Sequence, residues 1–245
     1  MRALAGLATV ALIAAGCSDG ADPDVLTVYA ASSLTTAFEQ LAEDFEADHD
    51  GVQVRLTFGG SSDLAAQIDQ GAPADVFAAA DQDTMAGLAD SDLVTDPVDF
   101  AGNTLMIAVP PDNPAAVTGL ADLARDDVRL VVCAPAVPCG AAAARLAEQQ
   151  GVELSPVSEE QSVTDVLTKV GSAEADAGLV YVTDVAAAGD DVRGIEVPGA
   201  GTVVNTYPIA TVADSERPAL AQEFVDLVRG PQGQRVLRAL GFRAP

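Results

Sequence analysis

Apolar and polar positions follow two different spacings along this chain. Residues 25–30 form a short apolar run rich in β-branched side chains, which is typical of a buried strand. Residues 52–58 alternate apolar with polar side chains and predict an amphipathic strand. Between the two runs, apolar residues are spaced as on one face of a helix: Leu34, Phe38, Leu41, Ala42 and Phe45.

The same alternation of strand and helix patterns continues toward the C-terminus. We expect further strands at residues 75–80, 104–109, 128–133, 177–182, 195–197 and 203–211. We expect further helices at residues 63–70, 140–150, 162–172, 216–229 and 232–240. Pro231 suits the first turn of the last helix. This order indicates an α/β fold in which helices cover both faces of a parallel sheet.

The N-terminal segment has the pattern of a secretory signal. Residues 1–16 carry one positive charge followed by an apolar run that is too short to span a bilayer. The run ends in Ala-Ala-Gly before Cys17, similar to a lipoprotein cleavage site, so we expect lipid attachment at Cys17. Residues 17–24 are small and polar and predict a flexible tether. Plain secretion with a free Cys17, or an uncleaved anchor, remain the alternatives.

Composition excludes several classes of function. The chain of 245 residues has 12 Lys and Arg against 37 Asp and Glu, a formal charge of −25, which disfavours nucleic acid and anionic membranes as partners. The single histidine, His49, lies in a polar segment at a helix end, where we expect a solvated side chain. A serine hydrolase would need such a base and a Gly-x-Ser-x-Gly elbow between a strand and a helix, and no predicted strand–helix junction carries one. A carboxylate pair among the 37 acids leaves other hydrolases open.

Besides Cys17, the expected mature chain contains two cysteines. Cys133 and Cys139 are separated by a short segment with two prolines. An exported protein meets an oxidising compartment, so these cysteines are a possible disulfide. Two small buried thiols are the alternative.

Two strand-turn-helix junctions carry hydroxyl groups. Ser32 and Ser33 follow the first strand, and Ser61 follows the second strand after two glycines. Serines at these places commonly cap the helix that follows. The free amides at a helix start can also bind an anion, and both junctions open toward the same edge of the sheet.

Several motifs, in their order and spacing, resemble the molybdate-binding proteins of ABC importers over about residues 26–242. The motifs are Ala-Ala-Ser-Ser-Leu at 30–34, Gly-Ala-Pro-Ala-Asp-Val-Phe at 71–77, Leu-Val-Tyr-Val-Thr-Asp at 179–184 and Arg-Gly-Pro-Gln-Gly at 229–233. The resemblance implies a two-lobed periplasmic-binding-protein fold (type II) whose lobes are mostly parallel sheets flanked by helices. Lobe 1 would comprise residues 25–103 and 209–245, and lobe 2 residues 104–208, with hinges near 102–105 and 205–208.

By the same resemblance, five residues would hold the oxyanion in the cleft. The donors would be the hydroxyls and amides of Ser33 and Ser61, the backbone amides of Cys139 and Val163, and the hydroxyl of Tyr181. Cys139 stands where the family usually has alanine. The implied function is binding of molybdate or tungstate, with molybdenum held as the oxyanion and no other cofactor. The protein would be a monomer without enzymatic activity that delivers its ligand to an integral-membrane ABC permease outside the cell membrane.

The net charge does not exclude such a ligand. A surface charge ~15 Å away repels a dianion by about 0.6 kcal/mol, and salt reduces this to about 0.1 kcal/mol. A charge-assisted hydrogen bond contributes ~1.5–3 kcal/mol, so five donor residues outweigh the repulsion. The alternative is a protein of the same fold for sulfate, phosphate or ferric iron. Phosphate would need an acceptor, for which Asp63 is the candidate, and iron would need the few tyrosines Tyr29, Tyr181 and Tyr207.

Overall fold

The computed structural model describes residues 24–245. The expected signal segment (1–16), the lipid-attachment residue Cys17 and all but the last residue of the expected tether (17–24) lie outside the described residues. Within residues 24–245, no helix has both the length and the apolar character needed to cross a membrane.

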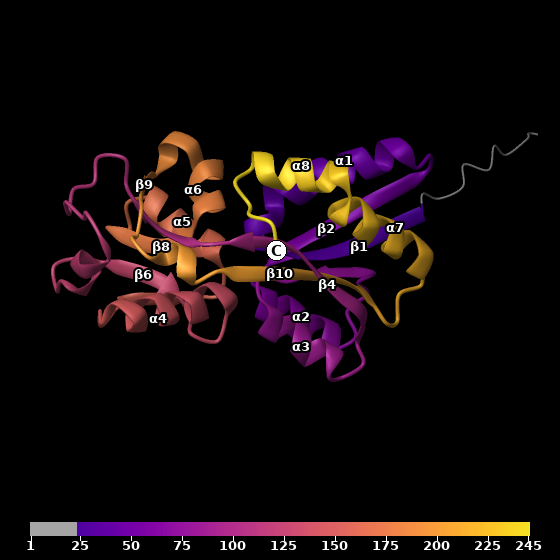
Figure 1. The fold of residues 1–245 in the computed structure, drawn as a ribbon, viewed down its shortest axis with the longest axis horizontal. Coiled ribbons are helices and arrows are strands. Elements are labelled where there is room, and N and C mark those ends of the chain that lie inside the picture. The colour runs from indigo at the N-terminus through magenta and orange to yellow at the C-terminus, as the bar shows by residue number, and fades with distance from the viewer. Residues whose placement is uncertain (1–23) are drawn as a thin grey trace, which may run out of the picture.

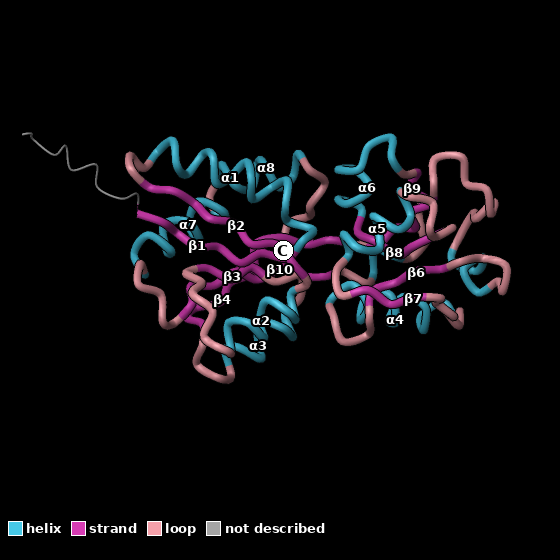
Figure 2. The backbone as a smooth tube through the Cα atoms, turned by 180° about the vertical axis from the view of Figure 1, so that it is seen from behind, coloured by secondary structure: helices cyan, strands magenta, loops and turns pink. Residues whose placement is uncertain are grey.

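The described chain folds into two lobes, each built on a five-stranded sheet (Figures 1 and 2). The first sheet has the order β2 (Val52–Gly59), β1 (Asp24–Ala31), β3 (Val76–Ala78), β10 (Asn205–Val212) and β4 (Val94–Asn103). The second sheet has the order β7 (Ser158–Glu160), β6 (Leu130–Cys133), β8 (Ala177–Tyr181), β5 (Leu105–Val109) and β9 (Arg193–Ile195). Both sheets are mixed, because each contains two parallel and two antiparallel pairings.

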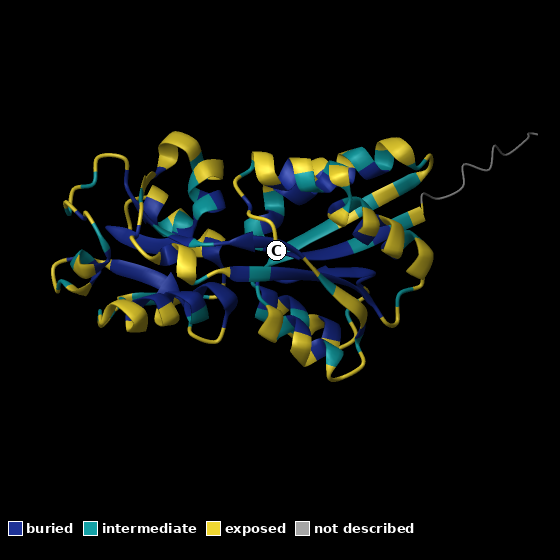
Figure 3. Ribbon diagram, viewed as in Figure 1, coloured by how far each residue is buried: buried dark blue, intermediate teal, exposed yellow. Residues whose placement is uncertain are grey.

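Helices cover both faces of each sheet, as the alternating pattern predicts (Figure 1). The first lobe carries α1 (Thr35–Asp48), α2 (Ser61–Asp69), α3 (Gln82–Ala89), α7 (Pro218–Arg229) and α8 (Pro231–Ala239). The second lobe carries α4 (Pro138–Gln150), α5 (Val163–Gly171) and α6 (Val182–Ala188). Short 3-10 turns complete the chain: η1 (Ser32–Leu34), η2 (Leu120–Ala124), η3 (Gly189–Asp191) and η4 (Ala200–Thr202). The central strands are buried, whereas the edge strands β2, β7 and β9 are partly exposed, and the helices expose their outer faces (Figure 3).

The parallel strands bring their carboxyl ends to the cleft between the lobes. β1, β2 and β3 are parallel in the first sheet, and β6, β7 and β8 are parallel in the second. The ends of these six strands, or the loops that follow them, all contribute residues to one cavity between the lobes. Ligands of open α/β sheets bind beyond the carboxyl ends of the strands, so this topology fixes where a ligand site belongs.

The chain passes between the lobes at two neighbouring points. Asn103 at the end of β4 pairs with Asn205 at the start of β10, and β5 of the second sheet begins at Leu105. Both passages therefore lie at the expected hinges. β10 belongs to the first sheet from Asn205 onward. Residues 205–208 therefore lie with the first lobe, and the prediction that they belong to lobe 2 is wrong.

Some elements differ from the sequence prediction. The pattern did not reveal α3, α6, β4 or β7. β4 is an edge strand that exposes residues 95–97, so it lacks a clear apolar alternation. α3 buries only Met85 and Leu88, too few to define a helical face. β9 ends at Ile195, where we expected the strand to begin.

Candidate ligand-binding site

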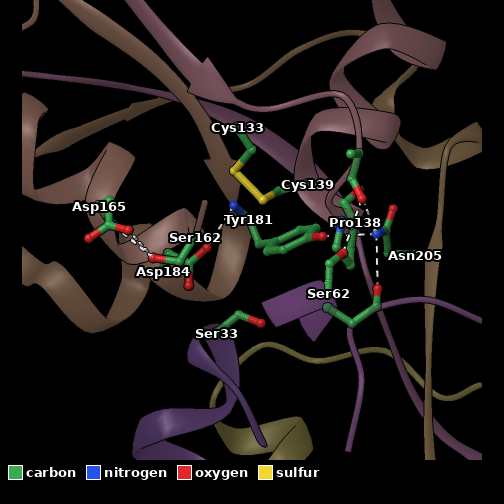
Figure 4. The surroundings of a disulfide bond; sticks show 12 residues. Ser33, Ser62, Cys133, Pro138, Cys139, Ser162, Asp165, Tyr181, Asp184 and Asn205 are labelled. Atoms are coloured by element: carbon green, nitrogen blue, oxygen red, sulfur yellow. Dashed lines mark hydrogen bonds between the residues drawn. A yellow bond between two sulfur atoms is a disulfide. The ribbon is translucent and has the colours of Figure 1, made fainter. Parts of the chain in front are cut away.

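The structure brings all five expected ligand residues to one cavity between the lobes. Ser33 and Ser61 reach it from the first lobe, and Cys139, Val163 and Tyr181 reach it from the second. Figure 4 shows Ser33, Cys139 and Tyr181 around this region, beside Asn205 at the start of β10. The full lining consists of Ala31, Ser32, Ser33, Gly59, Gly60, Ser61, Ala80, Val137, Pro138, Cys139, Gln161, Ser162, Val163 and Tyr181.

The hydroxyl of Ser61 is held as a donor toward the cavity. Ser61 is the first residue of α2, and only 2% of its surface is exposed. The backbone N–H of Ala80 donates to its Oγ over 3.0 Å. Because Ser61 Oγ already accepts this bond, its own proton is available to a ligand.

The hydroxyl of Ser33 bonds to a side-chain hydroxyl, whereas that of Ser61 bonds to a backbone amide. Ser33 lies in η1, directly after β1, and its Oγ lies 3.0 Å from the phenol oxygen of Tyr207 on β10. Neither Ser32 nor Ser33 caps a helix with its side chain. The expectation that these serines cap the following helix is therefore wrong, because the strand continues into a 3-10 turn that aims Ser33 at β10.

The second lobe has two expected ligand-binding amides, and the first of them, that of Cys139, lies at the start of α4. Pro138 occupies the first turn and has no N–H, so the amide of Cys139 is the first that the helix presents. A disulfide joins Cys139 to Cys133 at the end of β6, with Cα atoms 5.7 Å apart (Figure 4). A Cβ atom at Gly140 would lie 1.9 Å from the carbonyl oxygen of Ala134, so only glycine lets the bridged loop fold over the helix start.

The second amide of this lobe lies at the start of α5. Ser162 caps the helix: its Oγ accepts from the amide of Asp165 over 3.2 Å and donates to the Asp165 carboxylate over 2.7 Å. Val163 is the first helical residue, so its amide has no acceptor within the helix. The cap fixes the direction in which this amide points.

Tyr181 is a buried phenol whose oxygen also accepts an internal bond. The side-chain amide of Asn205 donates to the Tyr181 oxygen over 2.8 Å and to the carbonyl oxygen of Ala80 over 2.9 Å. Burial raises the pKa of Tyr181 well above its usual value, so the phenol keeps its proton and serves as a donor. Asn205 thereby links a ligand residue of the second lobe to the strand that returns to the first.

The cavity lining contains no charged side chain among the described residues. Asp63, which we expected near the site as a possible acceptor, is exposed and does not line the cavity. Asp184 is buried behind Tyr181 and accepts from its backbone N–H over 2.8 Å. Burial raises the pKa of Asp184 to about 7, because the charged form loses its hydration.

The lobes meet directly at the mouth of the cavity. Ser62 donates to the carbonyl oxygen of Ala136 over 3.0 Å. A Cβ atom at Gly60 would lie 2.1 Å from the carbonyl oxygen of Gln161. The enclosed volume is about 10 Å³, close to the room of one water molecule. The lobes must therefore part to admit any larger ligand.

Other chemistry finds less support in the part of the chain that the structure describes. His49 is not freely solvated as expected: its Nδ1 lies 2.7 Å from the carbonyl oxygen of Phe45, and its Nε2 lies 2.9 Å from the Glu223 carboxylate. Both ring nitrogens are thus engaged away from any serine. Within residues 24–245, no group of three or more His, Cys, Asp or Glu side chains could hold a metal ion.

Sequence reasoning gave the residues behind and beside the cavity no part in anion binding: Tyr207 was considered only as an iron ligand and Asn205 only as part of a hinge. In the structure, Asn205 and Tyr207 on β10 bond to the hydroxyls of Tyr181 and Ser33, and Gly60 lies against Gln161 across the cleft. Two polar residues on alternate positions of a predicted strand, facing a buried side, were the only signal for Asn205 and Tyr207.

Comparison with known proteins places this chain among binding proteins. Residues 26–243 match the sequence model of the family described as bacterial extracellular solute-binding protein. The molybdate-binding protein ModA of Mycobacterium tuberculosis is 46% identical over 221 residues, which cover 90% of this chain and 85% of that protein.

Solved structures share the fold at lower identity. The periplasmic molybdate-binding protein of Azotobacter vinelandii superposes with a TM-score of 0.78 at 22% identity, covering 90% of this chain and 99% of the other. The sulfate-binding protein SubI of Mycobacterium tuberculosis superposes with a TM-score of 0.73, also at 22% identity, covering 90% of this chain and 87% of the other. The fold is thus common to proteins named for different anions, and the side chains of the cavity must decide the ligand.

Proposed function

This chain belongs to the bacterial extracellular solute-binding protein family, and from that premise we propose that it binds molybdate and delivers it to an ABC permease. Its identity of 46% to the mycobacterial ModA protein supports molybdate as the ligand. Tungstate has nearly the same size and charge and binds at the same site. The observation that carries this function is an uncharged cavity in which donors from both lobes converge.

The cavity binds the oxyanion through dipoles and not through cations. Ser33 and Ser61 donate from the first lobe, and the amides of Cys139 and Val163 donate from the second, together with the hydroxyl of Tyr181. Two of these amides lie at helix N-termini, where the partial positive charge favours an anion. Each charge-assisted bond contributes ~1.5–3 kcal/mol, so the set outweighs the repulsion from distant surface acids.

The donors are divided between the lobes, and this division couples binding to closure. An open protein offers only one half of the donors, whereas a closed protein surrounds the oxyanion. Rotation about the two neighbouring passages at Asn103 and Asn205 brings the halves together. The closed form is then the form that a permease recognises as loaded.

The alternative ligands of this fold are less well supported. Hydrogen phosphate carries a proton that needs an acceptor, whereas the cavity lining within residues 24–245 has no carboxylate. Ferric iron needs several anionic or histidine ligands, and the described residues contain no such cluster. Sulfate has no proton and is distinguished from molybdate by size alone.

We further propose that the mature protein is a lipid-anchored monomer outside the cell membrane. The apolar segment before Cys17 and the polar residues after it support export and lipid attachment. Replacement of Cys17 with serine should leave ligand binding intact and release the protein from the membrane fraction. A variant that remains membrane-bound would contradict the anchor.

The function is tested by calorimetric titration of the mature protein with molybdate, tungstate, sulfate and phosphate. We expect saturable binding of molybdate and tungstate and much weaker binding of the other two anions. Ser61→Ala should weaken molybdate binding about tenfold to a hundredfold, the value of one charge-assisted bond. Ser91→Ala removes an exposed hydroxyl of the same lobe and should bind like the wild type. Strong sulfate binding without any heat from molybdate would overturn the assignment.

A further inference from the structure

Tyr207 lies behind the cavity, in a position that fixes its phenol. It is fully buried on β10, and it does not line the cavity itself. Three aromatic rings pack edge-on around it: Phe100 at 6.3 Å, Tyr181 at 5.9 Å and Phe242 at 5.7 Å between ring centroids. Its phenol oxygen lies 3.0 Å from Ser33 Oγ. The ring therefore cannot turn away from Ser33 without disturbing the core.

The surroundings of the phenol decide the direction of this hydrogen bond. Within residues 24–245, the contact with Ser33 Oγ is the one hydrogen bond of this phenol, and either oxygen could donate in it. The phenol is fully buried, so its proton would have no acceptor if Ser33 were the donor. The phenol therefore donates to Ser33 Oγ. Burial raises the pKa of Tyr207 above its usual value, so this proton stays in place at neutral pH.

The bond from Tyr207 directs the proton of Ser33. A serine hydroxyl rotates freely unless one of its lone pairs is occupied. With Tyr207 donating from behind, the hydroxyl of Ser33 presents its proton to the cavity. The hydroxyls of Ser61 and Tyr181 are oriented in the same way. The backbone amide of Ala80 donates to Ser61, and the side-chain amide of Asn205 donates to Tyr181. Each of the three oxygens then already accepts one internal bond, and each has its proton free for the ligand.

We propose that Tyr207 is a specificity-determining positioning residue that, by donating to Ser33, makes the cavity reject protonated oxyanions. This inference rests on the proposed function and identifies one cause of its selectivity. Without the phenol, Ser33 can turn and accept a proton. Hydrogen phosphate, which must place one proton on an acceptor, then gains a partner in the cavity, whereas molybdate loses an oriented donor.

The test compares two substitutions that each remove one phenol hydroxyl from a buried tyrosine. Tyr207→Phe keeps the ring and its packing, and Tyr29→Phe is the control, because Tyr29 is buried in the same sheet outside the cavity. Affinities for molybdate, sulfate and inorganic phosphate are measured by calorimetry at mildly alkaline pH, where phosphate is HPO₄²⁻. We expect Tyr207→Phe to lower the ratio of molybdate to phosphate affinity at least tenfold, while Tyr29→Phe leaves it unchanged.

A double-mutant cycle separates this role from a structural one. In a Ser33→Ala background, Tyr207→Phe should not change the anion ratio further, because the hydroxyl that it positions is gone. An equal loss for every anion, or an unchanged ratio, would overturn the inference. Failure of the wild type to bind molybdate would instead refute the proposed function. The sulfate-to-phosphate ratio would then still test the role of Tyr207, and a wild type that binds no anion would refute both.

Discussion

Replacement of Gly60 with alanine should hold the two lobes apart. Gly60 has φ −63° and ψ 134°, a conformation that alanine adopts without strain, so the effect of the new methyl group is purely steric. That methyl group would lie 2.1 Å from the carbonyl oxygen of Gln161 in the opposite lobe. Since such contacts are not made below 3.0 Å, the lobes must separate by about 1 Å at this point.

The cost of this separation follows from the division of donors. A hydrogen bond of about 2.9 Å that lengthens by about 1 Å keeps only part of its energy. Three donors belong to the second lobe: the amides of Cys139 and Val163 and the hydroxyl of Tyr181. A loss of about 1 kcal/mol from each gives about 3 kcal/mol, which is on the order of a hundredfold in Kd.

Calorimetry with molybdate measures this loss, and small-angle scattering measures the compaction that accompanies binding. The matched control is Gly87→Ala in α3, because a Cβ atom there meets nothing within 4 Å. We expect Gly87→Ala to bind and compact like the wild type, and Gly60→Ala to compact less. Binding by Gly60→Ala within threefold of the wild type would refute the reasoning that close approach at this glycine is required.

Two further predictions concern buried groups near the site. The pKa of Asp184 is about 7 in the folded protein against 3.8 as its ordinary value, so the folded state binds this proton more tightly and the free energy of unfolding falls as pH rises from about 4 to about 7. Above pH 7, Asp184→Asn should therefore raise the unfolding free energy by up to roughly 4 kcal/mol, which thermal melts record as a higher melting temperature with a flatter pH dependence. The exposed Asp190→Asn is the control. An unchanged pH profile in Asp184→Asn would contradict the buried charge. Reduction of the Cys133–Cys139 disulfide opens a seven-residue loop and should lower the unfolding free energy by about 2.4 kcal/mol, a shift of roughly 5–10 °C in Tm by calorimetry. An identical Tm for the reduced and oxidised proteins would show that the bridge does not stabilise the fold.

The alternation of strands and helices could largely be predicted from the sequence because it depends on local patterns. Ser33 and Ser61 each follow a predicted strand and precede a predicted helix, so these two junctions are visible in the sequence. The direction in which each serine hydroxyl donates is not visible there. Ser33 meets Tyr207 from 174 positions away, and no local pattern specifies that contact. The contact of Gly60 with Gln161 likewise exists only once the two lobes have closed.

The exposed and charged parts of the fold were also hard to predict. β4 carries two aspartates and a proline on an edge, where four of its ten positions are exposed. Its membership of the sheet depends on pairing with β10, which lies more than a hundred residues later. Tertiary pairing therefore creates this strand where the intrinsic preference is weak.

The uncharged lining of the cavity frees the outer surface from any part in recognising the anion. Acidic side chains on the outer helices can be gained, lost or reversed in sign over evolutionary time while the same anion is still selected. A relative adapted to brine and one adapted to fresh water could thus differ by tens of charges and share a single specificity. For the same reason, the surface charges of an engineered version can be substituted to suit attachment to a sensor without changing the residues of the cavity.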